Sequence, residues 1–419
     1  MLTLTIARRP RTTGRIGIAL AGGGPLGAFY ELGALQALAD CIEGLALNDL
    51  FAYAGVSSGS MLAAGLANGL TPADIGRIAI TNDSGREPAH PGLFLQPDIR
   101  EYARRLAGLP RIVWNVTEQF LRAPLSQGIA EFLAPFAAAM PAGFFDSAPF
   151  ERYLRRLYES GGRTNDFRQL RHRLFIVATN LNTGKEALFG QAGLDHVPIS
   201  RAIQASTALP GLYSPVRIDG ETYADGALLR TLHASVVLEA GADLLIGINP
   251  LVPFDASDGG SRPRETELAD HGLPVVLGQT LRSLVQSRMQ VGMAAYKDRF
   301  PRAEILLLEP DRADRRMFFA NMLRYSDRRR LVDHAYECTR RDLLRKRAEL
   351  APLLARHGLR LSRAALEDPA LSFESALARQ RVEDRRVVQD LSLTLDRLEA
   401  GLIPVKRKPA RLSRRGAAG

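Results

Sequence analysis

Residues 15–27 read Arg-Ile-Gly-Ile-Ala-Leu-Ala-Gly-Gly-Gly-Pro-Leu-Gly, an apolar run that passes through three glycines into a proline. Residues 15–20 predict a short buried β-strand that ends at the glycines. We expect a helix from Pro25, because proline suits the first helical position and the leucines that follow recur near helical spacing. The segment therefore predicts one strand–turn–helix unit.

A second unit of the same kind follows it. Residues 50–54 are an apolar run, residues 55–59 (GVSSG) are bounded by glycines, and an alanine- and leucine-rich run then ends at Asn68-Gly69. Asparagine and glycine are typical of helix C-termini. Two successive strand–helix units predict an α/β fold in which helices flank a mostly parallel sheet.

Composition divides the chain into four parts. We expect one α/β domain over residues 14–250, with an aromatic-rich, helical insertion at residues 84–170. Glycine, serine and aspartate mark residues 251–272 as a linker. Apolar residues at helical spacing predict a helical C-terminal annex over residues 273–403. Residues 404–419 are basic and are expected to be disordered.

The charge of the chain is concentrated near its C-terminus. The formal net charge is +10, of which residues 1–310 carry −1 and residues 311–419 carry +11. The nearly neutral main domain gives no reason to expect a nucleic-acid partner. The basic annex suits either an anionic membrane surface or an ordinary set of solvated, arginine-rich helices.

Cysteine content and hydropathy bear on the compartment. The two cysteines, Cys41 and Cys338, offer neither a disulfide framework nor a metal-ligand spacing, so we expect a reducing compartment, no metal and no cofactor. The N-terminal residues lack the continuous apolar core of a secretory signal. The uncharged residues 50–73 are too rich in glycine and serine for a membrane span. These features predict a cytoplasmic protein without a transmembrane helix.

Gly55-Val56-Ser57-Ser58-Gly59 fits the G-x-S-x-G nucleophile elbow. In that motif a tight strand-to-helix turn needs very small flanking residues and lifts the serine hydroxyl out of the backbone. The pattern alone is weak, but an apolar strand precedes it here and a helix-forming run follows it. Ser57 is therefore the candidate nucleophile.

Gly22, Gly23, Gly24 and Gly27 form a second motif at a predicted helix N-terminus. Their backbone N–H groups suit either the pyrophosphate of a dinucleotide or the oxyanion of a tetrahedral intermediate. A dinucleotide site needs an acidic residue after the second strand, where this chain has Gly55 instead. The oxyanion interpretation is therefore favoured.

A serine nucleophile also needs a base, and Asp225 is the candidate. It lies at the end of a strand-like segment, beside Gly226 and Ala227, although an aspartate there is also typical of a turn or cap. His233 is the one histidine shortly after Asp225, so a Ser-Asp-His triad is the alternative. The residues alone do not decide between a base role for Asp225 and a triad that includes His233.

Taken together, these motifs resemble the patatin-like phospholipase family, in its bacterial type. The resemblance covers residues 14–250 and rests on GGGPLG, GVSSG and DGA in the family's order, supported by residues 178–184 (ATNLNTG) and 205–211 (ASTALPG). It implies a three-layer α/β/α sandwich and a Ser–Asp dyad without histidine. It makes Ser57 the nucleophile, Asp225 the general base, and Gly22, Gly23 and Gly24 the oxyanion donors.

Three positions depart from the family's pattern. Many members have arginine where this chain has Leu26, aspartate where it has Asn180, and a second glycine where it has Ala227. None of these departures removes a group that the implied chemistry needs.

The resemblance implies hydrolysis of fatty-acyl esters such as phospholipids or lysophospholipids through an acyl-enzyme. The aromatic-rich insertion at residues 84–170 then forms either ordinary helical packing or an apolar wall that receives acyl chains. The basic annex predicts a peripheral contact with the inner face of an anionic membrane. Two alternatives remain: an esterase with a His233-containing triad, and a non-catalytic scaffold that binds proteins through its C-terminal helices.

Overall fold

The computed structural model describes residues 1–7, 10, 12–81, 91–122, 140–255, 268–318 and 325–382. The predicted basic tail, residues 404–419, lies outside these ranges. So do residues 256–267 of the predicted linker and residues 383–403 of the predicted helical annex.

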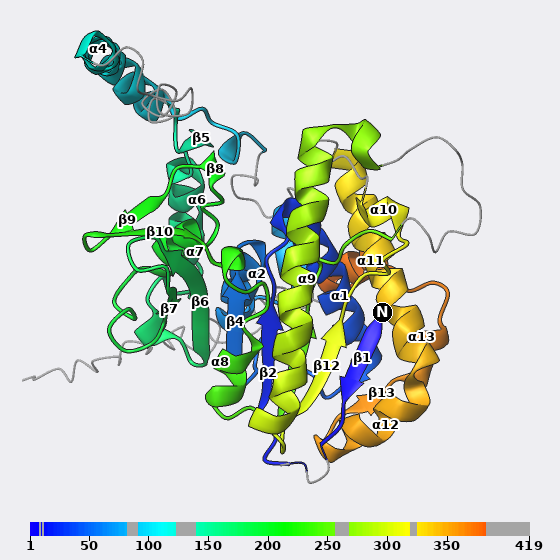
Figure 1. The fold of residues 1–419 in the computed structure, drawn as a ribbon. Coiled ribbons are helices and arrows are strands. Elements are labelled where there is room, and N and C mark those ends of the chain that lie inside the picture. Colours follow the sequence, from blue (N-terminus) through cyan, green and yellow to red (C-terminus); the bar gives the residue numbers. More distant parts are fainter. Residues whose placement is uncertain are drawn as a thin grey trace, which may run out of the picture.

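A nine-stranded mixed sheet forms the centre of the molecule (Figure 1). Its strands, in spatial order, are β1 (Leu2–Thr5), β12 (Glu304–Leu308), β11 (Leu244–Ile248), β2 (Ile16–Leu20), β4 (Ala52–Val56), β6 (Arg173–Asn180), β10 (Glu221–Asp225) and β9 (Val216–Ile218), with β7 (Glu186–Phe189) also paired to β6. The five strands from β12 to β6 run parallel, and the others pair antiparallel at the two sides. The prediction of a mostly parallel sheet is confirmed.

Helices cover both faces of the sheet, as expected for three layers. On β2, Ile16, Ile18 and Leu20 face one core. That core also holds apolar residues of α1 (Gly24–Cys41), α2 (Ser58–Ala67), α6 (Ala148–Tyr158), α7 (Ile199–Ser206) and α11 (Tyr325–Arg345). The alternate residue Ala19 faces a second core, which α8 (Ala234–Glu239) and α9 (Leu273–Arg299) cover. In Figure 1, α9 crosses the near face.

Two strands, β12 and the two-residue β13 (Arg360–Leu361), lie where the sequence predicted a helical annex, and β12 joins the central sheet. Residues 304–308 form β12, which pairs parallel with β11 and antiparallel with the N-terminal strand β1. All five residues are buried, so their sequence, Glu-Ile-Leu-Leu-Leu, has no alternating pattern that would mark a strand. The annex therefore contributes to the central sheet itself.

The remaining elements surround this sheet. They are β3 (Ile42–Glu43) paired with β13 (Arg360–Leu361), β5 (Gly143–Phe145) paired with β8 (Gly211–Tyr213), α3 (Pro72–Gly76), α4 (Ile99–Arg122), α10 (Arg315–Phe318), α12 (Arg347–Arg356), α13 (Arg363–Glu367), and single turns at Arg77–Thr81, Pro91–Leu93, Phe167–Gln169, Gly226–Leu228 and Leu268–His271. Among the described residues, every helix is too short or too polar to cross a lipid bilayer.

The annex is joined to the main domain through α1 and α11. A Cβ added to Gly33 of α1 would lie 2.3 Å from the carbonyl oxygen of Val332 and 2.8 Å from Cβ of Ala335, both on α11. Nearby, the Tyr336 hydroxyl donates to Asp40 Oδ2 at 2.7 Å. The two helix backbones are therefore in direct contact, and 12 of the 18 residues of α1 are buried.

We predict that Gly33→Ala lowers the free energy of unfolding by about 1–3 kcal/mol, because the added methyl group forces α11 away from α1. Urea unfolding at one pH measures it. The control is Gly292→Ala in α9, where the added Cβ meets nothing within 4 Å. That change should raise stability by about 0.5–1 kcal/mol through helix propensity. Equal effects of the two variants would contradict the close contact.

Candidate active site

Ser57 occupies the turn between β4 and α2. Its backbone has φ of 49° and ψ of −125°, a conformation that residues other than glycine rarely adopt. The Ser57 N–H donates to Ser206 Oγ at 2.8 Å, and Ser60 Oγ donates to the Ser57 carbonyl at 2.5 Å. Ser206 Oγ itself donates to the carbonyl of Val177 in β6 at 2.6 Å. These contacts hold the strained turn in place.

The glycines on either side of Ser57 are required by close packing. A Cβ on Gly55 would lie 2.5 Å from Cα of Ser60, and one on Gly59 would lie 2.6 Å from the carbonyl oxygen of Leu20 in β2. Real Cβ atoms do not approach backbone this closely. The G-x-S-x-G spacing thus reflects the space available in the turn.

Asp225 contacts Ser57 directly from the end of β10. Ser57 Oγ donates to Asp225 Oδ2 at 2.6 Å, and the Ala227 N–H donates to Oδ1 at 2.8 Å. The main chain of Asp225 is fixed as well, because its N–H donates to the Ala208 carbonyl and its carbonyl accepts from Thr179 Oγ1, both at 2.9 Å. The sequence left open whether Asp225 caps a turn or faces the serine, and in the structure it does both.

Burial changes the acidity of Asp225. The residue is 3% exposed, and the loss of water around its carboxylate raises its pKa from 3.8 to about 6, although the hydrogen bonds from Ser57 and Ala227 act in the opposite direction. With a pKa of about 6 the group is still mainly ionised at neutral pH. It is also a stronger base than an exposed aspartate.

The glycine loop lies against the serine turn. A Cβ on Gly22 would lie 3.0 Å from Cβ of Ser57 and 3.0 Å from Cβ of Ala227. Pro250, which follows β11, packs against the loop, since its Cγ would lie 2.7 Å from a Cβ on Gly23 and 2.8 Å from one on Gly27. The glycine loop and the Asp225–Ala227 turn therefore both lie against the turn at Ser57.

The N–H groups of the three consecutive glycines differ in their partners. The Gly22 N–H donates to the Thr231 carbonyl at 3.3 Å, and the Gly23 N–H donates to Ser58 Oγ at 3.1 Å. Gly24, the first residue of α1, is exposed and has φ of 59°. In the described part of the chain its N–H has no hydrogen-bond partner.

The structure accommodates two of the three departures from the family's pattern, Ala227 and Asn180. Gly226 must be glycine, because a Cβ there would lie 2.3 Å from the carbonyl oxygen of Val177. Ala227 offers its N–H to Asp225, a contact that its side chain does not obstruct. Asn180 instead supports the turn after β6, where its side-chain oxygen accepts from the N–H of Asn182 at 2.9 Å.

His233 does not join the Ser57–Asp225 pair. The ring is 1% exposed at the start of α8, and its Nδ1 lies 3.3 Å from Oε2 of Glu186. The closeness of His233 lowers the pKa of Glu186. Within the described residues, neither ring nitrogen makes a hydrogen bond. The arrangement that a Ser-Asp-His triad needs, with the ring between serine and aspartate, is absent from this part of the chain.

Several residues that support the site carried no prediction of their own. Ser206 and Thr179 lie within the two stretches that supported the family resemblance, but nothing in the sequence indicated that they hold Ser57 and Asp225. Ser60 and Ser58 were visible only as small residues of the turn. Their roles depend on contacts between segments far apart in the chain.

The described residues include one group with metal-ligand side chains, formed by Asp314, His334 and Cys338. His334 Nε2 and Asp314 Oδ2 lie 2.6 Å apart. This hydrogen bond, and secondly the one with Cys338, raises the pKa of His334 to about 10. Two ligands of one tetrahedral zinc ion would lie about 3.3 Å apart. In this arrangement His334 and Asp314 form a direct ion pair, and their ligand atoms lie closer together than two ligands of one zinc ion.

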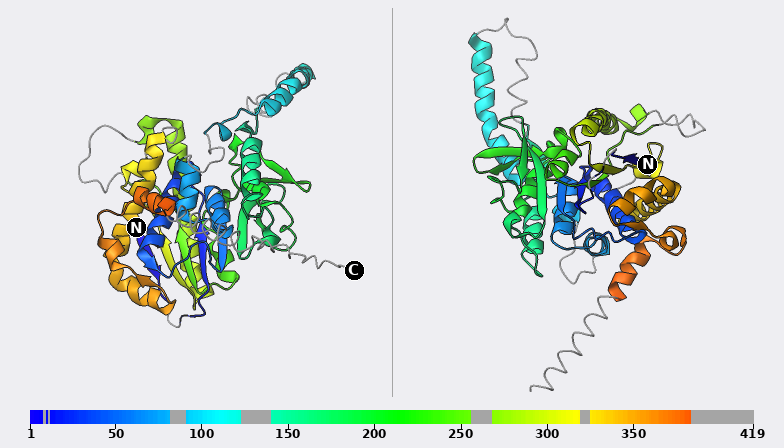
Figure 2. Two further views of the ribbon diagram at one scale, coloured as in Figure 1. Left: turned by 180° about the vertical axis from the view of Figure 1, so that it is seen from behind. Right: turned by 90° about the horizontal axis from the view of Figure 1, so that it is seen from below.

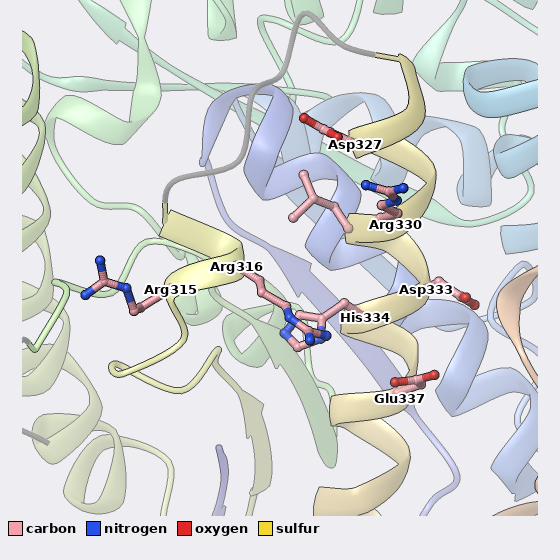
Figure 3. Close-up of a pocket in the computed structure, with 8 residues that line it drawn as sticks. Arg315, Arg316, Asp327, Arg330, Asp333, His334 and Glu337 are labelled. Atoms are coloured by element: carbon pink, nitrogen blue, oxygen red, sulfur yellow. The ribbon is translucent and has the colours of Figure 1, made fainter. Parts of the chain in front are cut away.

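His334 also lines a cavity of about 590 Å³ between α10 and α11 (Figure 3). Its other charged lining residues are three arginines and three acids: Arg315, Arg316, Asp327, Arg330, Asp333 and Glu337. Ser57 and Asp225 are not part of this cavity.

The fold and the site define a three-layer α/β protein whose buried Ser–Asp pair lies at a strand–helix turn. The family model described as Patatin-like phospholipase matches residues 18–238. This match spans more than half of the chain and includes Ser57, Asp225 and the glycine loop. The chain belongs to the patatin-like phospholipase family.

Relatives match it over limited lengths. A stretch of 73 residues is 40% identical to uncharacterized NTE family proteins of Mycobacterium bovis and Mycobacterium tuberculosis, covering 17% of this chain and 19% of theirs. An uncharacterized protein of Acanthamoeba polyphaga mimivirus is 24% identical over 250 residues, which is 59% of this chain and 69% of that protein. The chain thus aligns with about a fifth of the length of the mycobacterial relatives.

Two solved structures show partial similarity. The type III effector ExoU of Pseudomonas aeruginosa covers 97% of this chain and 68% of its own, with 15% identity and a TM-score of 0.35. VipD from Legionella pneumophila covers 56% of this chain and 50% of its own, with 17% identity and a TM-score of 0.32.

The raised pKa of Asp225 predicts how stability depends on pH. Between about pH 4 and 6 the folded protein binds a proton that the unfolded chain has lost, so the free energy of unfolding falls as the pH rises. Asp225→Asn lacks this titration. Relative to wild type, the variant should therefore gain roughly 2–3 kcal/mol between pH 4 and pH 7, measured by urea unfolding across the pH range.

Asp166→Asn is a control with the opposite sign. The hydrogen bond from Arg168 lowers the pKa of Asp166, so its contribution is present above about pH 4 and is lost as the pH falls further. Because Asp166 is partly exposed, its effect should be small. A difference between wild type and Asp225→Asn that does not change with pH would contradict the burial of an ionised Asp225.

Proposed function

We propose that this protein is a lipid acyl hydrolase that cleaves fatty-acyl esters through a Ser57–Asp225 dyad. Membership of the patatin-like phospholipase family supports lipid hydrolysis in general. The observation that carries the finer proposal is the 2.6 Å hydrogen bond from Ser57 Oγ to Asp225 Oδ2, buried at a strained strand–helix turn.

In the first step, Ser57 Oγ attacks the carbonyl carbon of the ester while its proton passes to Asp225 Oδ2. The tetrahedral intermediate collapses, the leaving alcohol takes the proton from Asp225, and an acyl-Ser57 ester remains. Water then attacks this ester while Asp225 again accepts a proton. The second tetrahedral intermediate collapses, Ser57 Oγ takes that proton back from Asp225, and the fatty acid departs. The pKa of about 6 allows Asp225 to accept and return the proton near neutral pH.

The oxyanion needs donors that the fold does not already use. The N–H of Gly24 meets this condition and lies at the N-terminus of α1, where the helix dipole favours negative charge. The N–H of Ser58, the residue after the nucleophile at the start of α2, is the second donor in this proposal. Gly22 and Gly23 shape the loop, and their own N–H groups hold it in place.

The substrate class follows from the family and from the charge distribution. A phospholipid, lysophospholipid or related fatty-acyl ester is the expected substrate, reached by peripheral contact with an anionic membrane from the cytoplasmic side. The sequence predicts this contact for the basic annex together with its tail, residues 404–419. The tail lies outside the described residues, so the contact stays a prediction.

Two alternatives are weaker for stated reasons. The triad esterase lacks a hydrogen bond from His233 to either Ser57 or Asp225 in the described structure. A non-catalytic scaffold would not need a strained Ser57 facing a buried carboxylate, since such strain costs about 1–3 kcal/mol.

We predict that Ser57→Ala and Asp225→Asn each lower esterase activity at least 10³-fold, whereas His233→Ala retains most of it. The assay is hydrolysis of a p-nitrophenyl acyl ester, together with labelling by a fluorophosphonate probe that reacts with activated serines. Labelling should occur in wild type and disappear in Ser57→Ala. Ser60→Ala and Ser206→Ala control for loss of the turn itself, and far-ultraviolet circular dichroism checks folding.

The outcomes separate the three functions. Normal turnover by Asp225→Asn would rule out the dyad. Loss of activity in a folded His233→Ala variant would favour the triad. An absence of both turnover and labelling in wild type would favour the scaffold.

A further inference from the structure

Helix α4 (Ile99–Arg122) extends away from the rest of the molecule (Figure 2). Three large apolar side chains on it are mostly exposed: Ile99 at 73%, Leu106 at 63% and Trp114 at 71%. They are separated by seven and eight residues, about two helical turns each, so they lie along one side of the helix. A row of large apolar side chains left exposed along one side of a helix points to a contact surface.

One flank of the apolar row on α4 is basic. Arg100, Arg104 and Arg111 are exposed, and by their spacing they follow the flank of the apolar row. In total α4 contains five arginines and two glutamates. The flanking charge is local, because residues 1–310 as a whole carry a net charge of −1.

The base of α4 is fixed to the body. The Asp98 carboxylate accepts from the Glu101 N–H at 3.0 Å and from Ser214 Oγ at 2.8 Å, and the Tyr102 hydroxyl donates to the Phe144 carbonyl at 3.2 Å. Phe144 lies in β5, which pairs with β8. These contacts set the direction of the helix relative to the sheet.

One of the two strands that support the N-terminal end of α4 lies close in the chain to the candidate active site. Strand β8 begins three residues after Ala208, whose carbonyl accepts from the N–H of Asp225. Phe144 and Leu212, in the paired strands β5 and β8, are 50% and 37% exposed, and Leu95 is 41% exposed. The exposed apolar surface therefore continues from α4 onto the segment that adjoins Asp225.

We propose that α4 and the apolar residues at its base dock on an anionic lipid surface, with α4 lying in the interface. A helix with an apolar row and a flanking row of arginines suits the boundary between acyl chains and negatively charged headgroups. A protein groove would accept the apolar row, but it would not account for the arginines beside it. The proposal rests on the lipid hydrolase function, because it brings Ser57 to a membrane-bound ester.

Trp114 makes the proposal directly measurable, since it is the one tryptophan of the chain. The full-length Ser57→Ala variant is mixed with vesicles of phosphatidylcholine, with or without phosphatidylglycerol, and its fluorescence is recorded beside cosedimentation. We expect a blue shift of Trp114 emission with the anionic vesicles and a much smaller one with phosphatidylcholine alone. Because this variant lacks the nucleophile, binding is tested apart from hydrolysis.

Charge and apolar variants of α4 provide the matched comparison. Arg100→Glu combined with Arg111→Glu should weaken vesicle binding at least tenfold, since each basic residue near an anionic leaflet strengthens binding about fivefold. Leu106→Ser should reduce the blue shift. Arg347→Glu combined with Arg363→Glu, on the exposed sides of α12 and α13, should leave both readouts unchanged. Deletion of residues 405–419 removes the tail and should leave the Trp114 shift in place.

Two results would overturn the proposal. One is cosedimentation without a change in Trp114 emission, which would assign the contact to another surface such as the tail. The other is an absence of vesicle binding, or equal losses in the α4 and control charge variants. Vesicle binding with a Trp114 shift, in a protein whose wild type hydrolyses no ester, would retain the docking surface and reject the proposed hydrolase.

Discussion

The hydrogen bond between Ser57 Oγ and Asp225 Oδ2 is the interaction on which the account of this molecule depends. It joins residues 168 positions apart in the chain. The sheet makes it possible, because β4 pairs with β6 and β6 pairs with β10, so the end of β10 lies close to the turn after β4. The glycines around this turn permit backbone approaches that any side chain would block.

The local part of this architecture could be predicted from the sequence. The strands β2 and β4 are short apolar runs followed by glycine-rich turns, and each turn leads into a helix, so pattern alone places them. Ser57 could be singled out for the same reason. Asp225 required the family resemblance, since an aspartate before Gly226 is equally typical of a turn.

The non-local part could not be predicted. Strand β12 is buried on both faces, and its unbroken apolar run does not distinguish a strand from a helix. Gly33 carries no sign in the sequence that α11, about 300 residues later, lies against it. Ser206 likewise acts on Ser57 from 149 positions away. Each of these contacts depends on tertiary packing, which periodicity and motif spacing do not encode.

The structure shows where charged residues gather on the molecule, which the net charge of the chain does not. The sequence places the positive surplus after residue 310, yet α4 adds a separate basic row inside a nearly neutral region. The ion pair of Asp314 with His334 shows that charges in the annex also serve the fold. Overall net charge therefore says little about which surface meets a partner.

The pH dependence of kcat/KM in the His233→Ala variant tests the central claim most directly. The account predicts that activity rises through about pH 6, as it does in wild type, because the base is the buried Asp225. Loss of this rise in a folded His233→Ala protein would show that the histidine is the base, and would contradict the Ser–Asp dyad.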